Sequence, residues 1–303
     1  MSDVYLKSVA VMDTVVTIQV CGRERDCAQR VEAALEWFLR IEACCSRFDE
    51  ASEVRQLDAH VGDAVRVSDT LFEAVQFALA VAEESGGAFD PTVGRRMELR
   101  GFDREHRTGR RTHTTFEESA AVSYRDVSVD PEHRTITLRQ PLVLDLGAVA
   151  KGLAVDMAAR ELAPLGDFAV DAGGDLYVAG HNPHGVPWSV GIRHPRLDDR
   201  AIETIAVSGA AVCTSGDYAR RAPTDGASHH IIDPRTGAST CALASVTVVA
   251  PTALVADALA TAAFVLGPVH GAALLERHGV DALLLTPALE RRVVSGSYHC
   301  FQA

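Results

Sequence analysis

The chain contains no Cys-x-x-Cys pair, the spacing that zinc ribbons and thioredoxin-like centres use. Its cysteines are an odd, scattered set of seven, namely Cys21, Cys27, Cys44, Cys45, Cys213, Cys241 and Cys300. Such a set is typical of free thiols in a reducing compartment, where cysteine serves as a small buried hydrophobe. The sequence therefore gives no support to structural zinc or to dithiol redox chemistry.

Positive charge is also in short supply. Acidic residues outnumber lysine and arginine by 41 to 29 among 303 residues, which gives a formal net charge of −12. A general nucleic-acid binder should be basic, so nucleic acid is not expected as a partner. A ligand that carries phosphate groups would need a metal cation, local lysine or arginine, or helix dipoles to offset this charge.

One segment departs from the acidic balance. Residues 95–115, RRMELRGFDREHRTGRRTHTT, are strongly basic. The usual explanation of such a run is a solvated loop. The alternative is a lid or an edge that meets an anionic ligand or an acidic partner, and both interpretations stay open.

Long hydrophobic runs and aromatic residues are missing as well. No window reaches the roughly 18 apolar residues that a membrane span needs. Asp3, Lys7 and Asp13 interrupt the apolar stretch near the start, unlike a signal peptide. We therefore expect a cytoplasmic protein without a membrane span, although an exported protein without its leader would look the same. Aromatics make up 6% of the chain, so valine, leucine and alanine must fill much of the core.

The chain has neither G-x-G-x-x-G nor G-x-x-x-x-G-K-[ST], which excludes a dinucleotide fingerprint and a P-loop. Residues 142–180 offer another way to bind phosphate. An apolar run ends at Asp145, a helical stretch carries Lys151-Gly152, and a second apolar run ends at Gly173-Gly174-Asp175. This order predicts a strand, a turn, a helix, a strand and a Gly-Gly turn, a platform on which backbone N–H groups and a helix N-terminus can approach phosphate oxygens.

Hydrophobic periodicity predicts an α+β fold, because strands outnumber helices and do not alternate with them regularly. No linker or repeat divides the chain, so we expect a single domain over residues 1–303. Helices are expected at 26–45, at 70–84 with a capping box of Thr70 and Glu73, at 252–266 and at 269–278. Strands are expected at 15–20, 122–129, 134–139, 188–193, 201–207, 210–214, 229–232, 245–250, 282–285 and 293–297, with a turn at Ser215-Gly216-Asp217.

Asp257 and Thr261 are the most informative polar pair. They lie four residues apart in the apolar stretch ALVADALATAAFVLG, on one face of the expected helix. A carboxylate there is costly unless it is paired or hydrogen-bonded. One interpretation is structural, with Thr261 bonded back to the Asp257 carbonyl while Asp257 caps a neighbouring element. The other is a hard-cation site, because carboxylate and hydroxyl oxygens suit Mg²⁺, which also keeps waters or substrate phosphates.

Other candidates are weaker on their own. Lys151 is either an exposed lysine at a helix start or a point charge that meets a phosphate or clamps Asp145. His230 is either a structural histidine or a group that contacts a cofactor or moves a proton. Asp90, in the stretch Phe89-Asp90-Pro91-Thr92, has a simple turn-forming explanation.

Taken together, these motifs resemble the ApbE family, the FAD:protein FMN transferases, over nearly the whole chain and in the same order. The matching pieces are Met12-Asp13-Thr14, Ser46-Arg47-Phe48, residues 87–94 (GAFDPTVG), residues 145–152 (DLGAVAKG) with Asp156, Gly173-Gly174-Asp175, residues 214–218 (TSGDY), residues 230–234 (HIIDP) and residues 256–261 (ADALAT). Each piece is modest, but the ordered set is specific.

The resemblance implies an α+β fold with T-fold-like antiparallel sheets flanked by helices, and a site for Mg²⁺ and FAD. The implied metal ligands are the main-chain carbonyl of Ala148 and the side chains of Asp257 and Thr261. The implied FAD contacts are Met12, Phe48, Ala88, Phe89, Asp90, Asp145, Lys151 and His230, with Gly173, Gly174, Ser215 and Gly216 nearby. The chain departs from the family in residues 95–102, where a Pro-Leu and a Trp-Gly-Phe motif are common, and in Asp13, where glycine is commoner.

The activity implied is Mg²⁺-dependent transfer of the FMN part of FAD to a Thr or Ser hydroxyl of an acceptor flavoprotein, with release of AMP. Asp257 and His230 are the candidate bases, and a carboxylate that holds Mg²⁺ is a poor base, which favours His230 or a metal-bound water. A second possibility is an FAD pyrophosphatase that yields FMN and AMP, with water in place of the hydroxyl. A third, of another class, is a flavin-binding protein without turnover.

Overall fold

The computed structural model describes residues 3–22, 26–105, 109–112, 114–115, 122–222 and 228–301. Its contacts group into two compact units. The first unit comprises Met1–Leu39, Lys151–Ala219 and Cys241–Ala303, and the second comprises Arg40–Ala150 and Arg220–Thr240. Two helices run from one unit into the other, α1 (Cys27–Cys45) and α5 (Gly147–Leu162).

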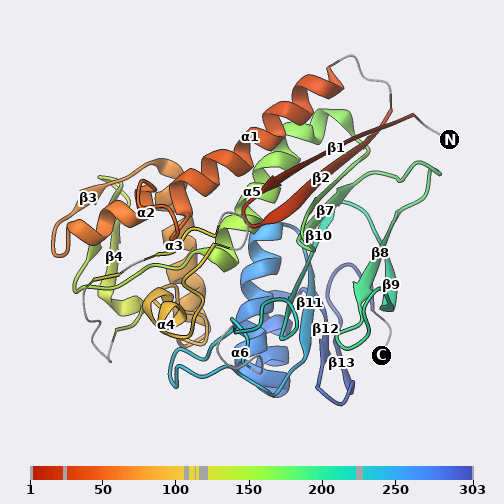
Figure 1. The fold of residues 1–303 in the computed structure, drawn as a ribbon. Coiled ribbons are helices and arrows are strands. Elements are labelled where there is room, and N and C mark those ends of the chain that lie inside the picture. The colour runs from red at the N-terminus through yellow and green to blue at the C-terminus, as the bar shows by residue number, and fades with distance from the viewer. Residues whose placement is uncertain are drawn as a thin grey trace. The chain divides into compact units, whose positions relative to one another are not determined.

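An eight-stranded antiparallel sheet forms the centre of the first unit, in the order β1-β2-β6-β7-β10-β11-β12-β13 (Figure 1). The strands are β1 (Val4–Val11), β2 (Thr14–Cys21), β6 (Phe168–Ala172), β7 (Leu176–Ala179), β10 (Ala210–Gly216), β11 (Ser245–Ala250), β12 (Asp281–Leu285) and β13 (Arg291–Val294). The long helix α6 (Ala253–His278) packs along β10, β11 and β12. A separate hairpin of β8 (Trp188–Arg193) and β9 (Ala201–Val207) completes the unit, with the short 3₁₀ turn η3 (Ala163–Leu165) after α5.

Alternation along β10 decides which side chains meet α6. Val212 lies in a hydrophobic cluster with Trp188, Val190 and Leu283, so its face of the strand turns toward the β8–β9 hairpin. Successive residues of a strand point to opposite faces. Cys213 and Ser215 therefore point to the other face, where Cys213 contacts the carbonyl of Ala253 at the start of α6. The strand brings Ser215 to α6 by this alternation.

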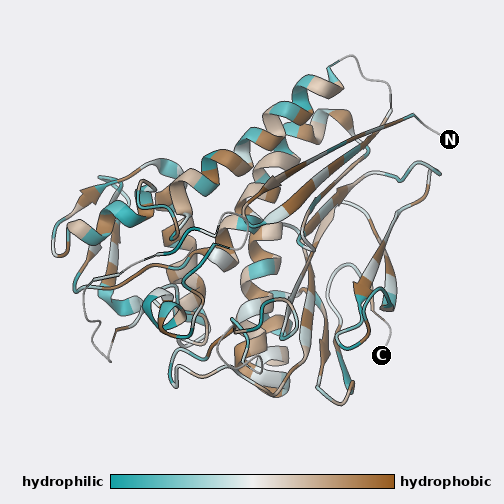
Figure 2. Ribbon diagram, viewed as in Figure 1, coloured by the Kyte–Doolittle hydropathy of each residue, from teal (hydrophilic) through white to brown (hydrophobic). Residues whose placement is uncertain are grey.

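The second unit carries a three-stranded antiparallel sheet in the order β3-β5-β4. Its strands are β3 (Val65–Arg66), β4 (Val127–Asp130) and β5 (Thr135–Leu138), and its helices are α2 (Glu53–Gln56), α3 (Asp69–Glu84) and α4 (Gly94–Leu99), with 3₁₀ turns η1 (Leu57–Ala59) and η2 (Tyr124–Asp126). The prediction of α+β architecture with antiparallel sheets flanked by helices is confirmed. Hydropathy colouring shows the expected two-sided character of α1, with hydrophobic and hydrophilic residues alternating along it (Figure 2).

Four local predictions are wrong, the first at residues 124–126, where the 3₁₀ turn η2 replaces part of the strand expected over 122–129. Residues 142–144 are buried but form no strand, because Val143 and Asp145 bond instead to the loop at Pro91 and Gly94 (Gly94 N to Val143 O 3.1 Å, Asp145 N to Pro91 O 2.7 Å). Residues 229–232 make only isolated bridges and no strand. Ser215 and Gly216 belong to β10 and not to a turn.

The caps of the helices also differ from expectation. Helix α3 begins one residue before Thr70, and its N-cap is Ser68, whose hydroxyl accepts a hydrogen bond from Leu71 N at 3.2 Å. Helix α6 bends at Gly267, with φ 78° and ψ −177°, just before Pro268. The predicted break between residues 266 and 269 is therefore confirmed, because proline cannot continue the hydrogen-bonding of the helix before it.

One helix in the described part of the chain, α6, is long and apolar enough to cross a membrane by length and composition alone. Of the most apolar 18-residue stretch of this helix, 67% is buried inside the structure, as expected of a helix packed at the core of a domain. The cysteines are free thiols, and Cys21, Cys27, Cys44, Cys45 and Cys213 are buried, in keeping with their predicted role as small hydrophobes.

Candidate functional site

The start of α6 is fixed by two carboxyl-to-backbone contacts. Asp156 on α5 accepts hydrogen bonds from Ala253 N at 2.7 Å and from Leu254 N at 2.9 Å. These are amide groups that the first turn of a helix leaves without partners. Burial raises the pKa of Asp156 to about 6, and the two N–H bonds oppose that rise. Asp156 thus holds the N-terminus of α6 against α5.

Gly152 makes the close approach of α5 and α6 possible. A Cβ atom at this position would lie 2.6 Å from the carbonyl oxygen of Ala253, nearer than real Cβ contacts come. Its N–H donates to the carboxylate of Asp257. In a regular helix this N–H would bond to the carbonyl of Ala148, and the backbone of α5 is non-helical at Ala148, with φ −91° and ψ 15°. In the motif Lys151-Gly152, the glycine therefore allows close helix packing and donates a hydrogen bond, while the lysine supplies a positive charge.

Asp257 lies one turn into α6 with its side chain only 8% exposed. Its Oδ2 atom is buried and accepts no hydrogen bond. The Nζ of Lys151 lies 4.0 Å from that oxygen, too far for a hydrogen bond. Burial raises the pKa of Asp257, while Lys151 and the N–H of Gly152 act in the opposite direction. An ionised oxygen with this surrounding has unused capacity to bind a cation.

Thr261 lies on the same face of α6 as Asp257. Its Oγ1 lies 2.9 Å from the Oγ of Ser215 on β10. A hydroxyl pair between helix and strand therefore takes the place of the expected bond from Thr261 back to the carbonyl of Asp257. The other half of the structural interpretation is present, because Asp257 accepts from the N–H of Gly152 on the neighbouring helix. The pair was not predictable from local spacing, because Ser215 and Thr261 are distant in sequence.

Lys151 forms its close ion pair with Asp175, whose side chain is 5% exposed. It is one of two lysines in the chain, the other being Lys7. The predicted clamp of Lys151 on Asp145 is replaced by this pair, since Asp145 has an arginine partner in the second unit, described below. Asp175 is the residue that sequence reasoning passed over, although it closes the Gly173-Gly174-Asp175 motif.

The loop between β1 and β2 carries Met12 and leads into Thr14, which lies against the glycine turn at Gly173. Met12 and Asp13 both have left-handed backbones, with φ of 52° and 59°. They are the two central residues of a tight hairpin in which Val11 pairs with Thr14. A left-handed conformation is strained for methionine, and such strain is concentrated at functional sites. Gly173 lies against Thr14 and leaves no room for a side chain.

These residues test whether the first unit can hold Mg²⁺. The described residues contain no group of three or more His, Cys, Asp or Glu side chains placed to bind a metal. The donors present are one carboxylate oxygen without a hydrogen bond, at Asp257, and the hydroxyls of Ser215 and Thr261. Few protein oxygens, all hard, match the way Mg²⁺ binds when substrate phosphates and waters complete its shell. The residues therefore fit this ion. The proposed ligand Ala148 belongs to the second unit, and its part in the site stays a prediction.

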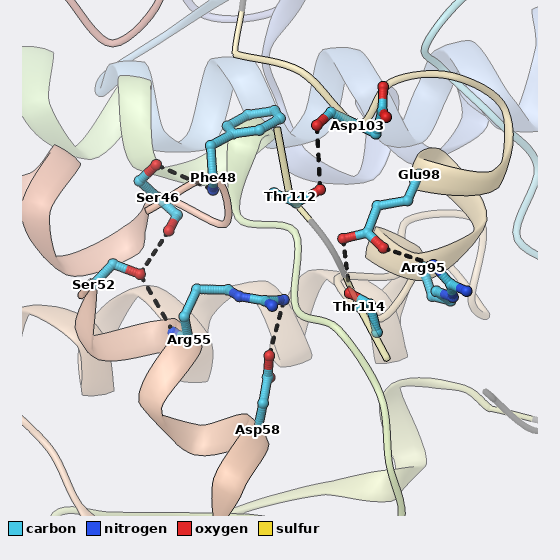
Figure 3. Close-up of polar contacts among 10 residues, drawn as sticks. All are labelled: Ser46, Phe48, Ser52, Arg55, Asp58, Arg95, Glu98, Asp103, Thr112 and Thr114. Atoms are coloured by element: carbon cyan, nitrogen blue, oxygen red, sulfur yellow. Dashed lines mark hydrogen bonds and ion pairs between the residues drawn. The ribbon is translucent and has the colours of Figure 1, made fainter. Parts of the chain in front are cut away.

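In the second unit, the sequence-predicted residue Asp145 is held by Arg47. The Nε of Arg47 lies 2.7 Å from Asp145 Oδ2, and Asp145 Oδ1 accepts from Gly147 N at 2.8 Å. Arg47 also donates to the carbonyl of Phe102 at 2.6 Å, and its guanidinium stands 4.1 Å from the centre of the Phe48 ring. Figure 3 shows Phe48 above the hydrogen-bonded chain Ser46, Ser52 and Arg55. The aromatic ring is thus backed by a buried, fixed cation.

The stretch that includes Ala88 and Phe89 is organised by Asp90. Its Oδ1 accepts from the backbone N and the hydroxyl of Thr92 at 2.9 and 2.7 Å, and its Oδ2 accepts from Tyr124 N at 3.0 Å. Burial raises its pKa, and these hydrogen bonds lower it. Both oxygens are engaged inside the protein, so the turn-forming role is present. A direct FAD contact by Asp90 stays a prediction, as it does for Ala88 and Phe89, which are almost fully buried.

His230 lies in a loop that its neighbours hold in place. The ring of the adjacent His229 is fixed by the carbonyl of Thr240 at 2.6 Å and by the N–H of Ile231 at 3.2 Å. One ring nitrogen therefore faces a carbonyl acceptor and the other faces an N–H donor. The ring of His230 meets Phe102 edge to face, with centroids 6.5 Å apart. His229 is structural, and His230 stays the candidate for chemistry.

The described part of the basic segment is largely engaged within the second unit. Arg96 donates to the carbonyl of Pro234 and Arg100 to that of Gly237. Arg95 pairs with Glu98, which also accepts from Thr114 at 2.9 Å (Figure 3). These contacts favour an internal bracing role for the arginines on α4. Residues 106–108 and 113 lie outside the described part of the chain, so a role in acceptor binding stays a prediction.

Comparisons with known proteins agree with the order of the motifs. The ApbE family model matches residues 12–284. An FAD:protein FMN transferase of Treponema pallidum is 34% identical, with 96% of this chain and 87% of that protein covered. One of Vibrio cholerae is also 34% identical, over 79% of this chain and 74% of the other. Among solved structures, an ApbE protein of Thermotoga maritima matches with a TM-score of 0.86 at 32% identity, covering 96% of this chain and 97% of its own. The flavin transferase ApbE of Vibrio cholerae matches with a TM-score of 0.84 at 26% identity, covering 97% of this chain and 98% of its own.

Proposed function

Because this chain belongs to the ApbE family, we propose that it is an FAD:protein FMN transferase that uses Mg²⁺ and modifies a Thr or Ser hydroxyl of an acceptor flavoprotein. The relatives named above support FAD as the substrate and a protein as the acceptor. The choice of metal and of hydroxyl rests on the residues of this chain. The observation that carries the proposal is the buried Oδ2 of Asp257, which accepts no hydrogen bond and lies on the helix face that also carries Thr261.

The reaction is a transfer at phosphorus. The acceptor oxygen attacks the phosphorus on the FMN side of the FAD pyrophosphate, the bond to the AMP oxygen breaks, and AMP leaves with that electron pair. The acceptor proton passes to a base, for which we propose His230, since Asp257 is committed to the cation. FMN ends as a phosphoester on the acceptor.

The protein groups divide the remaining tasks. Asp257 and Thr261 would hold Mg²⁺, with Ser215 fixing the Thr261 hydroxyl at 2.9 Å. When bound, the ion would neutralise charge on the pyrophosphate oxygens and on the leaving group. Lys151 brings a single positive charge to the same place, which suits a phosphate. These positive charges answer the problem that an acidic protein poses for an anionic substrate.

The test uses the full chain, FAD and a candidate acceptor flavoprotein, with and without Mg²⁺. We expect AMP release and, by mass spectrometry, a peptide of the acceptor that carries FMN on a Thr or Ser. Release of AMP together with free FMN and an unmodified acceptor would show FAD hydrolysis instead. Bound FAD that stays intact with Mg²⁺ present would show a flavin-binding protein without turnover. Equal modification in EDTA would remove the metal from the proposal.

A further inference from the structure

Asp175 has a contact that the proposed chemistry does not use. It follows Gly173 and Gly174, where its carbonyl accepts from Ala172 N at 2.9 Å and closes the turn between β6 and β7. Its side chain is nearly fully buried and forms an ion pair with Lys151. A buried ion pair of this kind is not needed for the turn, which the backbone already closes. The position of Lys151 is what the pair controls.

Lys151 lies between two carboxylates, one that it pairs with closely and one that it does not bond to. Asp175 holds its ammonium group in a direct ion pair, whereas Asp257 Oδ2 lies 4.0 Å away and accepts no hydrogen bond. Rotation about the flexible lysine stem would let the same ammonium bond to Asp257, because lysine carries three donors on one mobile atom. An ammonium bonded to Oδ2 would compete with a divalent cation for that oxygen, through both occupancy and like-charge repulsion.

Resting on the proposed function, we propose that Asp175 is a positioning residue that retains Lys151 and so keeps Asp257 available to the divalent cation. Without Asp175, the ammonium group of Lys151 would bond to Asp257 and occupy the oxygen that the cation needs. With it, Lys151 stays near enough to meet a substrate phosphate without occupying the oxygen that the metal needs.

The choice of lysine at this position supports the argument. Arginine supplies nearly all the basic side chains of this chain, and only Lys7 and Lys151 are lysines. A guanidinium is a broad, planar fork that tends to bind a carboxylate through two bonds. A single ammonium can bond to Asp175 while leaving Asp257 unbonded. The geometry therefore needs the smaller cation.

A double-mutant cycle on metal binding tests this role without relying on turnover. The probe is Mn²⁺, titrated into the full-length, FAD-free protein and followed by electron paramagnetic resonance. We expect Asp175→Asn to weaken Mn²⁺ binding by about tenfold, the size of coupling common between contacting charges. We expect Lys151→Met to leave binding equal or tighter. In the Lys151→Met background, Asp175→Asn should have almost no effect.

Two outcomes would overturn the proposal. If Asp175→Asn weakens Mn²⁺ binding equally in both backgrounds, Asp175 acts only as one more negative charge. If Lys151→Met itself weakens binding tenfold, Lys151 does not compete for Asp257. Thermal unfolding identifies any variant that fails to fold, and Lys151→Met, which removes a half-buried side chain, keeps the test decisive if Asp175→Asn is too unstable. Glu32→Gln is the matched control, because it removes the carboxylate partner of Lys7, the other lysine.

The lysines give a second readout. With lysine labelled by ¹³C at its ε-carbon, the protein has two such resonances, and Lys7→Arg assigns them. Mn²⁺ should broaden the Lys151 signal and leave that of Lys7 sharp.

Asp257→Asn separates this inference from the proposed metal site. If that variant binds Mn²⁺ as the wild type does, the metal site itself is wrong. If it loses Mn²⁺ but the cycle shows no coupling, only the role of Asp175 is wrong.

Discussion

Asp90 and Asp145 of the second unit differ from Asp257 of the first in how fully their oxygens are used. In the second unit, Asp90 and Asp145 have both oxygens engaged, by Thr92 and Tyr124 in one case and by Arg47 and Gly147 in the other. In the first unit, Asp257 keeps a buried oxygen without a hydrogen bond. Buried ionised oxygens are costly unless compensated. The difference indicates that Asp90 and Asp145 fix loops of the second unit, whereas Asp257 keeps one oxygen for a cation.

The contrast holds within the first unit as well. Asp281 is fully buried, and its oxygens accept from Tyr298 N at 2.8 Å and Cys300 N at 3.2 Å. Asp156 has both oxygens on the first turn of α6. Asp257 is buried like Asp281 and Asp156, but it differs from them because one of its oxygens has no hydrogen-bond donor. Substitutions at these aspartates test whether this difference in oxygen use has functional consequences.

The largest effect is expected from Asp257→Asn. Replacing the charged oxygen removes the carboxylate that would hold Mg²⁺, so FMN transfer should fall by at least about 1000-fold. Stability should change little or rise, because a buried charge with a free oxygen is lost. AMP release and chemical unfolding measure the two effects.

Asp281→Asn is the matched control for that experiment. It makes the same chemical change at another buried aspartate of the first unit, and its new amide group faces an N–H donor. We expect lower stability with FMN transfer per folded molecule near the wild-type rate. If both variants lose transfer equally, the contrast between them has no functional meaning.

Asp90→Asn tests the second unit. The carboxylate accepts from Thr92 with one oxygen and from Tyr124 with the other. In asparagine one of these oxygens becomes an NH₂ group, which would face an N–H donor. We therefore expect a loss of about 2–3 kcal/mol in unfolding free energy. Mn²⁺ affinity should be unchanged, since this carboxylate has no free oxygen. Urea unfolding and Mn²⁺ titration check the two parts. A variant of normal stability that binds Mn²⁺ poorly would reverse the assignment of roles.

The raised pKa of Asp156 in the folded protein should make stability depend on pH. Burial raises its pKa from 3.8 to about 6, so between these values the folded protein retains a proton that the unfolded chain has released. Stability therefore falls as pH rises through that interval, by up to about 3 kcal/mol, and levels off above it. Urea unfolding from pH 4 to 7 should show this slope in the wild type. The slope should be smaller in Asp156→Asn, and an identical slope in both would assign it to other groups.

Local signals in the sequence predicted local structure around the candidate site. The spacing of Asp257 and Thr261 placed them on one helix face, and Gly267 with Pro268 ended the first part of that helix as expected. These predictions succeeded because the relevant contacts lie within a few residues. The order of motifs carried the family assignment in the same way, and the family model agrees with it.

Long-range pairing was not predictable from the same signals. Nothing in the spacing of Lys151 selects Asp175 over Asp145 as its partner, since both lie at the ends of apolar runs. The run at 142–144 is apolar enough for a strand, but its polar backbone atoms bond to the loop at Pro91 and Gly94. Strand formation depends on an available neighbouring strand, which one segment does not reveal.

The smallest effect is expected from Ser215→Ala. It leaves Asp257 and Thr261 in place and removes only the hydroxyl that lies 2.9 Å from Thr261 Oγ1. A single hydrogen bond of this kind is worth about 1 kcal/mol, so the Mg²⁺ concentration for half-maximal FMN transfer should rise by roughly threefold to tenfold while the maximal rate stays nearly constant. The control is Thr214→Val, which breaks the hydroxyl pair with Thr247 on the opposite face of β10 and should leave the Mg²⁺ dependence unchanged. A rise of the same size in both variants would mean that the strand, and not the hydroxyl on its α6 face, sets the affinity for the ion.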